Sequence, residues 1–381
     1  MTTDAAAEIR AQALEVAAGW SPPDAPRSWA LTAALFRAIA AHEQLLGRLA
    51  ELPPGRLPAL LASAAISYLV RRDRPAPLAS YFPVPGPRAG QPPLDDRFGP
   101  AARAFCSARL DDILAECAGR RYQMNEVARC TQIALGIAAL TGPAARAEPV
   151  ALADLGTGAG LGLHLDRYRY QVGGQVTGPA GAPLTLDCAA RGPLTPPPAA
   201  LPPIAERAGL DLHPVDVTDA AALAWLEACA PPEATALARL TAAIDVTRRH
   251  PVPLLAGDAL DLLPAVLASF PPGRPVIVTD AYLAVFQSGP QREQLTSILA
   301  GAARTRPVTW LSLDPLVPLG PAGRDSVQGL PLPPGLVRDY QQHGVFAVLG
   351  ARTFRDGASQ GRLLARAHPS GQWIEWLDPR S

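Results

Sequence analysis

The residues with the clearest chemical potential lie in one short segment, which runs from Val150 to Gly162. An apolar run ends in Asp154, and glycines then occupy positions 156, 158 and 160 ahead of a helix-like stretch. Glycines let the backbone turn sharply and let a ligand approach the main chain, while the next helix offers unpaired N–H groups at its start. The carboxylate of Asp154 repels a pyrophosphate and suits a ligand with a positively charged amino group.

The spacing D-x-G-x-G-x-G at the end of a strand resembles motif I of class I S-adenosylmethionine-dependent methyltransferases. This resemblance implies that Gly156, Gly158 and Gly160 make room for the cofactor and that Asp154 meets its aminoacyl end. A dinucleotide fingerprint requires G-x-G-x-x-G, and Leu161 stands where its last glycine belongs. NAD or another nucleotide, and a glycine turn without any ligand, are the alternatives.

A second acid follows another short apolar run, in the segment Leu254–Asp261. This segment resembles the "GDA" element after the third strand of the same enzymes, which implies that Asp258 lies beside the adenine. An aspartate directly before the run ALDLLPAVL is also a favoured helix N-cap. The two roles are compatible, and both are carried forward.

Asp280 and Tyr282 follow the apolar run Val276–Thr279, which is expected to be the fourth strand. Ligands of open α/β sheets gather at the carboxyl ends of the strands, so both residues are expected on the substrate side. The Asn/Asp-Pro-Pro-Tyr motif of amino-methylating relatives is absent, and the acceptor is therefore not inferred. A capping or surface role is the alternative for Asp280.

The acid that commonly holds the ribose hydroxyls at the end of the second strand is harder to place. Asp187 is the first candidate and lies 33 positions after Asp154, beyond a glycine-rich segment, 169–183, that is expected to be an inserted hairpin. Asp211 and Asp216 are the rivals. The alternative for Asp187 is a solvated strand end.

A polar segment opens the helix expected at 121–140. Tyr122, Asn125 or Glu126, and Arg129 fall at i, i+3 or i+4, and i+7, so they share a face. Asn125 is the one asparagine of the chain. A cleft-facing surface that binds substrate is one interpretation, and an exposed helix end with a Glu126–Arg129 pair is the other.

Four motifs occur in a fixed order: YQMNEVARC, DLGTGAGLGLHLDRYRY, LDLHPVDVTD and GDALDLLP. Together they resemble a bacterial family of unknown function, the one numbered 2332, over about Trp20 to Leu377. The resemblance implies a Rossmann-like, methyltransferase-like fold, and it strengthens the case for Asn125, Glu126 and Arg129 as site residues.

The elements that position these residues change in type along the chain. Helical periodicity is expected at 3–19, 28–51, 57–71 and 99–118, with no strand before residue 149. From there strands at 150–155, 184–188, 252–256, 276–279 and 308–313 alternate with helices at 160–168, 219–229, 233–249, 259–269 and 290–304. Three further strands are expected at 345–352, 362–368 and 372–377. The sequence therefore predicts an α-helical region over 1–145 and a Rossmann-like α/β domain over 146–381. Its sheet is expected to be mostly parallel, with helices on both faces and antiparallel strands at its end.

Composition excludes several classes of function. The chain has 381 residues, 48% of them hydrophobic, and 34 arginines with no lysine balance 34 acids. The missing lysine excludes Walker-type nucleotide binding and Schiff-base chemistry on a protein lysine. Zero net charge argues against a nucleic-acid partner, and no apolar run of membrane-spanning length is present. Five cysteines without a CxxC and six scattered histidines form no zinc pattern, and a cytoplasmic location is expected.

The resemblance to class I methyltransferases implies an S-adenosylmethionine-dependent enzyme, most simply one that transfers a methyl group, and the neutral charge favours a small-molecule acceptor. A base is expected from Glu126, Asp280 or His164, although a lone helical histidine is more often structural. The alternatives are a non-catalytic protein that binds a ligand or partner on a methyltransferase-like fold, and another reaction of the same cofactor, such as cyclisation or aminocarboxypropyl transfer.

Overall fold

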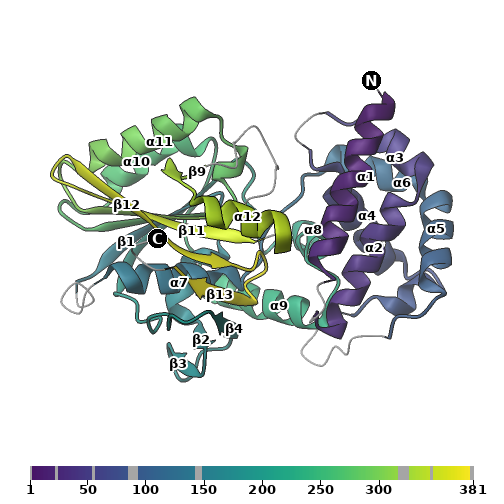
Figure 1. Cartoon of the computed structure of the whole chain (residues 1–381), viewed down its shortest axis with the longest axis horizontal. Helices are drawn as coiled ribbons and strands as arrows, with labels where there is room; N and C mark the ends of the chain where they lie inside the picture. Colours follow the sequence, from purple (N-terminus) through teal and green to yellow (C-terminus); the bar gives the residue numbers. More distant parts are fainter. Residues whose placement is uncertain are drawn as a thin grey trace. The chain divides into compact units, whose positions relative to one another are not determined.

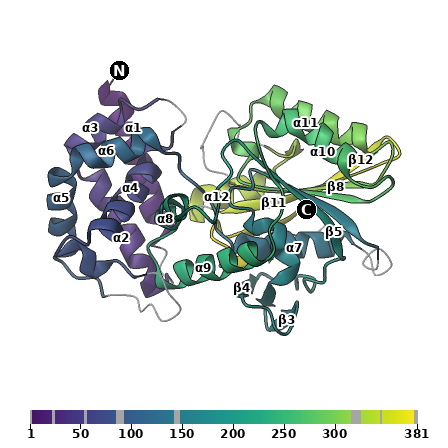
Figure 2. The same cartoon turned by 180° about the vertical axis from the view of Figure 1, so that it is seen from behind.

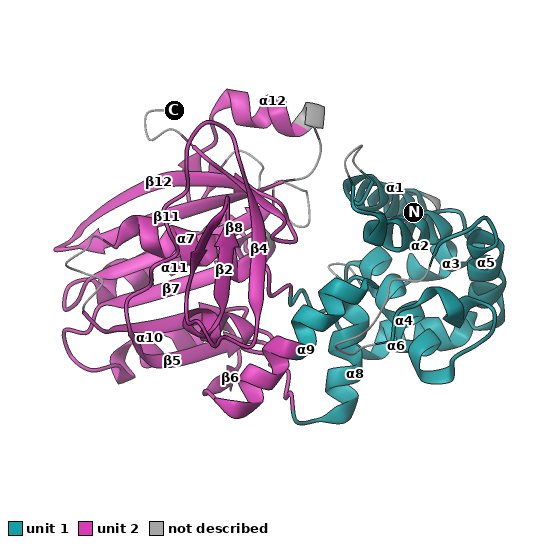
Figure 3. Ribbon diagram, turned by 90° about the horizontal axis from the view of Figure 1, so that it is seen from below, with its two compact units in different colours: residues 1–125, 218–241 teal, residues 126–217, 242–381 magenta. Residues whose placement is uncertain are grey.

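The structure is a computed structural model, which describes residues 2–21, 25–53, 56–84, 93–141, 148–315, 326–343 and 346–377. The chain divides into two compact units, with residues 1–125 and 218–241 in unit 1 and residues 126–217 and 242–381 in unit 2 (Figure 3). The predicted domain boundary at 145–146 lies outside the described residues. The segment 218–241, which was expected in the second domain, belongs to unit 1.

Unit 1 is built from helices. They are α1 (Thr2–Gly19), η1 (Arg27–Trp29), α2 (Ala30–Ala40), α3 (Glu43–Leu49), α4 (Pro58–Asp73), η2 (Leu78–Tyr81), α5 (Phe98–Ala108), α6 (Leu110–Gly119) and α8 (Ala220–Cys229). The helices expected at 3–19 and 57–71 are confirmed. The two longer runs, 28–51 and 99–118, each divide into separate helices. The first divides because the His42 side chain accepts a hydrogen bond from the Leu45 amide at 3.1 Å and caps α3.

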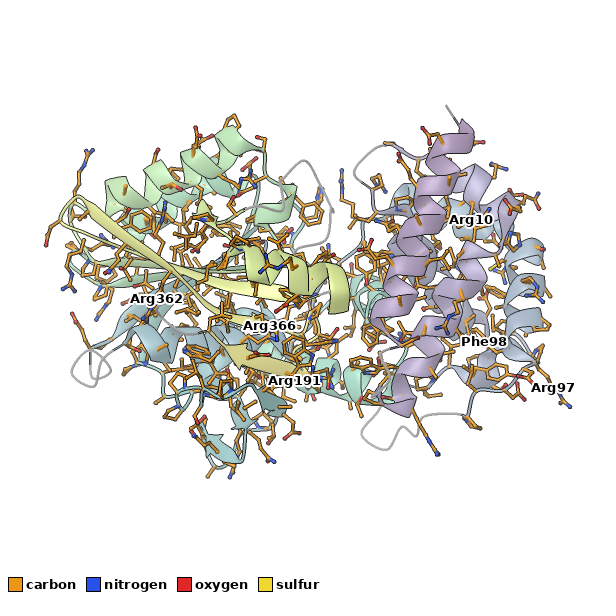
Figure 4. All side chains as sticks on the ribbon, viewed as in Figure 1. Arg10, Arg97, Phe98, Arg191, Arg362 and Arg366 are labelled. Carbon is orange, nitrogen blue, oxygen red and sulfur yellow. The ribbon has the colours of Figure 1, made fainter. Side chains whose placement is uncertain are left out.

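The core of unit 1 consists of leucine, isoleucine and alanine side chains between these helices. Leu35, Ile39, Leu61 and Ile66 are fully buried in it. Polar side chains tie the outer surface together: Arg10 of α1 donates to the Glu43 carboxylate of α3 at 2.6 Å (Figure 4). An exposed ion pair of this kind contributes little because water screens the two charges, so apolar burial holds the unit together.

Unit 2 contains an eleven-stranded, mostly parallel sheet. Its strands are β1 (Val150–Leu155), β2 (Arg169–Val172), β3 (Gln175–Thr177), β4 (Thr185–Arg191), β5 (Ile204–Asp211), β6 (Leu254–Ala256), β7 (Val276–Ala281), β8 (Val308–Pro315), β11 (Ala347–Arg355), β12 (Ala358–Ala367) and β13 (Trp373–Trp376). Their order across the sheet is β3-β2-β4-β13-β12-β11-β8-β7-β1-β5-β6. The five strands from β8 to β6 are parallel to one another, so their carboxyl ends share one edge.

Helices cover both faces of this sheet. α10 (Ala259–Ser269) and α11 (Gly289–Ala302) lie together on one side, and α7 (Arg129–Leu140) lies on the other (Figures 1 and 2). Gly136 of α7 lies so close to the sheet that an added Cβ would come within 2.4 Å of Leu311. On the opposite face Trp310, with no exposed surface, packs among the residues of α10 and α11. The helices expected at 259–269 and 290–304 are confirmed, as are those at 219–229 and 233–249, which are α8 and α9 (Ala234–Arg249).

The C-terminal strands are antiparallel, as predicted. β11 pairs antiparallel with β8 and β12, and β12 pairs antiparallel with β13. Arg366 of β12 binds Glu375 at 2.8 Å and Asp339 of α12 (Pro334–His343) at 3.0 Å, and Arg191 of β4 lies over the ring of Trp373 (Figure 4). The expected hairpin at 169–183 is confirmed as the antiparallel pair β2–β3. α12 and the short pair β9 (Ser326–Val327) and β10 (Leu330–Pro331) were not predicted.

Three sequence predictions about the elements are wrong. β5 was missed, although it lies directly beside β1. The segment 184–188, expected as the second strand of the α/β core, forms β4 and pairs with β13 and β2 instead. The first eight residues of the helix expected at 121–140 are not helical, because α7 begins at Arg129.

Candidate functional site

The glycine loop leaves β1 through a left-handed turn. Gly156, Gly158 and Gly160 have φ values of +67°, +56° and +74°, a region that side-chain-bearing residues rarely adopt. The amides of Gly156 and Thr157 donate to the Leu210 carbonyl at 2.8 and 3.2 Å, which folds the loop back over the end of β5. The three glycines predicted to shape a ligand loop therefore do shape a tight loop at the carboxyl edge.

Asp154 is held rigidly at the end of β1. One carboxylate oxygen accepts a hydrogen bond from the Thr157 hydroxyl at 2.8 Å, and the other accepts one from the Thr279 hydroxyl at 2.7 Å. Burial raises the pKa of Asp154 to about 6, although the two threonine hydroxyls favour its ionised form. Space beside it is scarce, because a Cβ at Gly162 would come within 3.1 Å of its Oδ2 atom.

The acid at the end of the strand beside β1 is Asp211, not Asp187. Asp211 ends β5, where its carboxylate accepts hydrogen bonds at 2.8 Å from the amides of Gly158 and His213. Asp187 is an exposed residue of β4, and five strands separate β4 from β1. The topological basis for Asp187 is therefore wrong, and its rival Asp211 occupies the position that was sought. Asp216, the other rival, follows β5 in a loop.

Asp258 follows β6 and caps α10, as one of its two interpretations predicted. Its carboxylate accepts a hydrogen bond from the Leu260 amide at 2.8 Å. The Gly257 amide donates to the Asp211 carbonyl at 2.9 Å, which draws the ends of β5 and β6 together. Asp154, Asp211 and Asp258 thus lie at the ends of three neighbouring parallel strands, or just after them, on one edge.

Asp280 is neither a capping residue nor a surface residue. It is 1% exposed on β7, where its carboxylate accepts from the Trp310 indole N–H at 2.7 Å and contacts the Ser312 hydroxyl at 2.8 Å. The same hydroxyl contacts Asp314 Oδ2 at 2.7 Å. Burial raises the pKa of both carboxyls, to about 6 for Asp314 and well above the ordinary value for Asp280.

Tyr282 and Arg129 meet at the same end of the sheet. The Arg129 guanidinium lies 3.8 Å from the centre of the Tyr282 ring, and its Nε donates to the Pro369 carbonyl at 2.7 Å. Tyr282 has φ of +69° and is 5% exposed, and its hydroxyl has no hydrogen-bond partner among the described residues. Glu126 lies one turn earlier and accepts from the Ala128 amide at 3.1 Å.

Tyr122 and Asn125 belong to unit 1, in a segment that is neither helix nor strand. The Tyr122 hydroxyl donates to the Cys229 carbonyl at 2.9 Å, and the Asn125 amide donates to the Gln123 side chain at 3.3 Å. The shared helical face expected for Tyr122, Asn125, Glu126 and Arg129 therefore does not form. Of these four residues, Glu126 and Arg129 lie in unit 2 with the glycine loop.

His164 lies on η4 (Leu161–Arg167), which follows the glycine loop, but it does not face outward. Its side chain has no exposed surface, and neither ring nitrogen has a hydrogen-bond partner in the described ranges. Burial and the charges of Arg207 and Arg167 lower its pKa to about 4. A buried imidazole that stays neutral is a core residue, as the structural interpretation of His164 held.

Sequence reasoning missed Thr279, Ser312 and Asp314. Thr279 was read only as the last residue of an apolar strand, and Ser312 and Asp314 alternate with leucines in β8. A buried strand needs no polar side chains, so a polar residue at every second position was the available signal. The exposed Leu212, directly after Asp211, was also missed, and 61% of its surface is accessible.

The carboxyl edge of the parallel strands is anionic and partly apolar. The aspartates at 154, 211, 258, 280 and 314 all lie at the ends of β1, β5, β6, β7 and β8 or directly after them. An exposed leucine stands beside one of them. Such an edge attracts a ligand that carries positive charge and an apolar group, and it repels phosphates. In the described part of the chain, no group of three His, Cys, Asp or Glu residues is arranged to hold a metal ion.

Fold and site together define a mixed α/β protein with a helical N-terminal unit and an acidic edge at its parallel strands. The model of the family described as "uncharacterized protein conserved in bacteria" (DUF2332) matches residues 8–376. The chain therefore belongs to this family, as its four motifs indicated. No curated protein matches the chain. None of the helices among the described residues is both long and apolar enough to cross a membrane.

Proposed function

We propose that this protein binds S-adenosylmethionine at the carboxyl ends of β1, β5 and β6 and transfers its methyl group to a small molecule. The observation that carries the proposal is the pair of carboxylates beside the glycine loop. Asp154 and Asp211 make this edge anionic, and the Asp211 carboxylate also accepts a hydrogen bond from the Gly158 amide at 2.8 Å. A phosphate would meet two negative charges there and would find this loop amide already bonded.

Strand order supports the same position. In chain order the five parallel strands β1, β5, β6, β7 and β8 lie across the sheet as third, second, first, fourth, fifth. This order resembles that of Rossmann-type sheets, whose ligands bind outside the carboxyl ends where the order reverses, and the resemblance supports the proposed position. The reversal lies at β1, between β5 and β7.

Each part of the ligand has a matching group on this edge. The ammonium group matches Asp154, the ribose hydroxyls match Asp211, and the adenine matches Asp258 and the apolar surface of Leu212. When bound, S-adenosylmethionine supplies a methyl group on a positively charged sulfur. The protein contributes orientation and a fixed anionic environment, because its threonine and amide donors hold the carboxylates in place before the ligand arrives.

Calorimetric titration with S-adenosylmethionine, S-adenosylhomocysteine and NAD tests the proposal. We expect both adenosyl ligands to bind, and we expect Asp211→Asn to weaken their binding about tenfold, which corresponds to about 1.4 kcal/mol. Asp187→Asn is the matched control, because five strands separate the strand of this exposed aspartate from β1, and it is expected to bind as the wild type does. Tight binding of NAD alone, or equal losses in the two variants, would contradict the proposal.

The products then identify the reaction. Incubation of the protein with S-adenosylmethionine and a small-molecule extract is expected to yield S-adenosylhomocysteine, the product of methyl transfer. Methylthioadenosine in its place would indicate aminocarboxypropyl transfer. Binding without any turnover would indicate the non-catalytic alternative.

A further inference from the structure

Two buried carboxyl groups meet on one hydroxyl at the ends of β7 and β8. Ser312 Oγ lies 2.8 Å from Asp280 Oδ1 and 2.7 Å from Asp314 Oδ2. A serine hydroxyl carries a single hydrogen, so it can donate to only one of these two oxygens. The second short contact is favourable only if the other carboxyl carries a proton and donates it to Ser312 Oγ. Two ionised carboxyls would instead place a lone pair of Oγ against a buried negative charge.

The surroundings of Asp280 and Asp314 also favour a state in which the two carboxyls together carry one proton. Asp280 is 1% exposed and Asp314 is 4% exposed, so burial opposes a charge on both. Among the groups that face the pair, Trp310 donates to Asp280 at 2.7 Å, and Arg292 and the Ala284 amide favour ionised Asp314. Asp154 acts in the opposite direction, since its negative charge raises the pKa of Asp280. These groups stabilise one negative charge on the pair.

The pair also has unsatisfied polar atoms. Asp314 Oδ1 and the Tyr282 hydroxyl are both buried without a hydrogen-bond partner among the residues that the structure describes. The Tyr282 amide donates to the carbonyl of Leu313, the residue before Asp314, at 2.9 Å. Burial raises the pKa of Tyr282, and the charge of Asp314 adds to this rise. Buried polar atoms without partners are rare in proteins, and they mark a place where a proton or a ligand group is expected.

We infer that Asp280 and Asp314 share one proton through Ser312 and that this pair is the proton-accepting group of the site, serving an acceptor with an N–H or O–H group. The inference rests on the proposed function for its catalytic part. A positive charge bound beside Asp154 lowers the proton affinity of the pair, so the shared proton leaves when S-adenosylmethionine binds. The pair is then fully ionised and has room to take up one proton after the positive charge has left the sulfur.

Proton uptake follows from the movement of charge during transfer. A lone pair of the acceptor nitrogen or oxygen forms a bond to the methyl carbon, the carbon–sulfur bond breaks, and its electrons stay on sulfur. The positive charge thereby moves from sulfur to the methylated acceptor. The acceptor then releases its proton to the ionised pair, which regains its single shared proton, and the product leaves neutral. Asp314 works through Ser312 and Asp280, so it is a positioning residue for this proton.

The first test needs no ligand. Carboxyl signals of protein labelled with ¹³C-aspartate are followed by NMR over a pH titration. We expect one carboxyl of the pair to be protonated at neutral pH, and we expect this signal to be lost in Asp280→Asn and Asp314→Asn. Asp187→Asn is the control and should keep it. Two carboxyls that both titrate at the usual aspartate pKa would overturn the inference.

The second test counts protons by calorimetry in two buffers with different ionisation enthalpies, at the midpoint of the titration found by NMR. Wild-type protein is expected to release protons when it binds S-adenosylmethionine and to release fewer with S-adenosylhomocysteine, which lacks the sulfonium charge. Asp154 contributes protons too, so the difference between wild type and Asp314→Asn measures the share of the pair. Equal release by both proteins would refute the coupling. Absence of any binding would instead refute the proposed function, while the NMR result still decides whether the proton is shared.

Discussion

His164 is expected to cause much of the loss of stability of unit 2 at acidic pH. Its imidazole is fully buried, and burial with the neighbouring Arg207 and Arg167 charges lowers its pKa to about 4, against 6.5 in an unfolded chain. Asp166 offsets part of this effect, and His250 adds slightly to it. The unfolded state therefore binds a proton between pH 6.5 and 4 that the folded state refuses, and stability falls as the pH falls through this range.

We expect the free energy of unfolding to decrease by about 2 kcal/mol between pH 7 and pH 5 on account of His164 alone. His164→Leu removes this titration and should reduce the loss, which urea unfolding at the two pH values measures. His213→Gln, which removes an exposed histidine, is the control and should behave as the wild type does. An undiminished loss in His164→Leu would show that other groups cause the acid sensitivity.

Acids at the carboxyl edge of the sheet could be predicted from the sequence where each one directly followed an apolar run. Asp154, Asp258 and Asp280 were found in this way, because a carboxylate directly after a buried strand lies at a sheet edge. Asp314 follows the same rule, but the strand predicted at 308–313 ends one residue before it. The pairing of Asp280 with Asp314 through Ser312 depends on the contact between two strands, and a single sequence does not contain that information.

At the scale of elements, Asp258 is the N-cap of α10. Removal of the cap in Asp258→Ala is expected to lower the free energy of unfolding by about 1 kcal/mol, whereas Asp258→Ser retains a capping oxygen and should remain close to wild type. If the carboxylate also serves the ligand, both variants should bind S-adenosylmethionine more weakly. Thermal unfolding and calorimetry on the same two proteins separate the roles. Wild-type affinity in Asp258→Ser would leave capping as its one role.

Two elements were misjudged because their polar residues are satisfied by distant partners. β5 contains Glu206 and Arg207 in its middle. These charged residues interrupt the apolar pattern that a strand between β1 and β6 is expected to show. Arg207 forms a two-pronged ion pair with Asp166 at 2.7 Å, and Arg274 lies 3.2 Å from Glu206. These ion pairs make the burial of a charged strand tolerable, and neither partner lies near β5 in the sequence.

Distant partners also explain why the segment before α7 is not helical. Residues 121–128 have helical spacing, but the Arg121 carbonyl accepts from the Trp225 indole at 2.8 Å and the Tyr122 hydroxyl donates to the Cys229 carbonyl. Those bonds reach α8, about a hundred residues further along the chain. Tertiary contacts of this kind override helix propensity, which is a weak preference.

At the scale of the whole molecule, zero net charge conceals an uneven distribution. The arginines and acids balance over the chain, yet the ends of the five parallel strands carry aspartates. The sequence correctly placed a helical region before an α/β sheet with antiparallel strands at its end, because these changes follow from local periodicity. It did not reveal that residues 218–241 return to unit 1, because a helical pattern does not specify which unit the helix packs in.

This returning segment is expected to be essential for the stability of unit 1. Trp225 of α8 is 5% exposed in the core of that unit, and its ring lies edge-on to Tyr68 of α4 at 5.8 Å. The Arg120 guanidinium lies over both rings, at 4.7 Å from Tyr68 and 5.0 Å from Trp225. Arg71 of α4 donates to the Glu227 carbonyl, and its burial lowers its pKa to about 10.

Replacement of this indole therefore tests whether a segment inserted between β5 and β6 stabilises helices that begin the chain. Trp225→Ala should cost about 3 to 5 kcal/mol, and the amides of α4 should then exchange with solvent much faster. Trp225→Phe is the matched variant, because it keeps a ring against Tyr68 and loses the bond to the Arg121 carbonyl and part of the ring volume, so a smaller loss is expected. Faster exchange confined to α8, with α4 protected as in the wild type, would contradict this expectation. The loss of Trp225 would then affect only its own helix, and the helices of residues 1–125 would not depend on it.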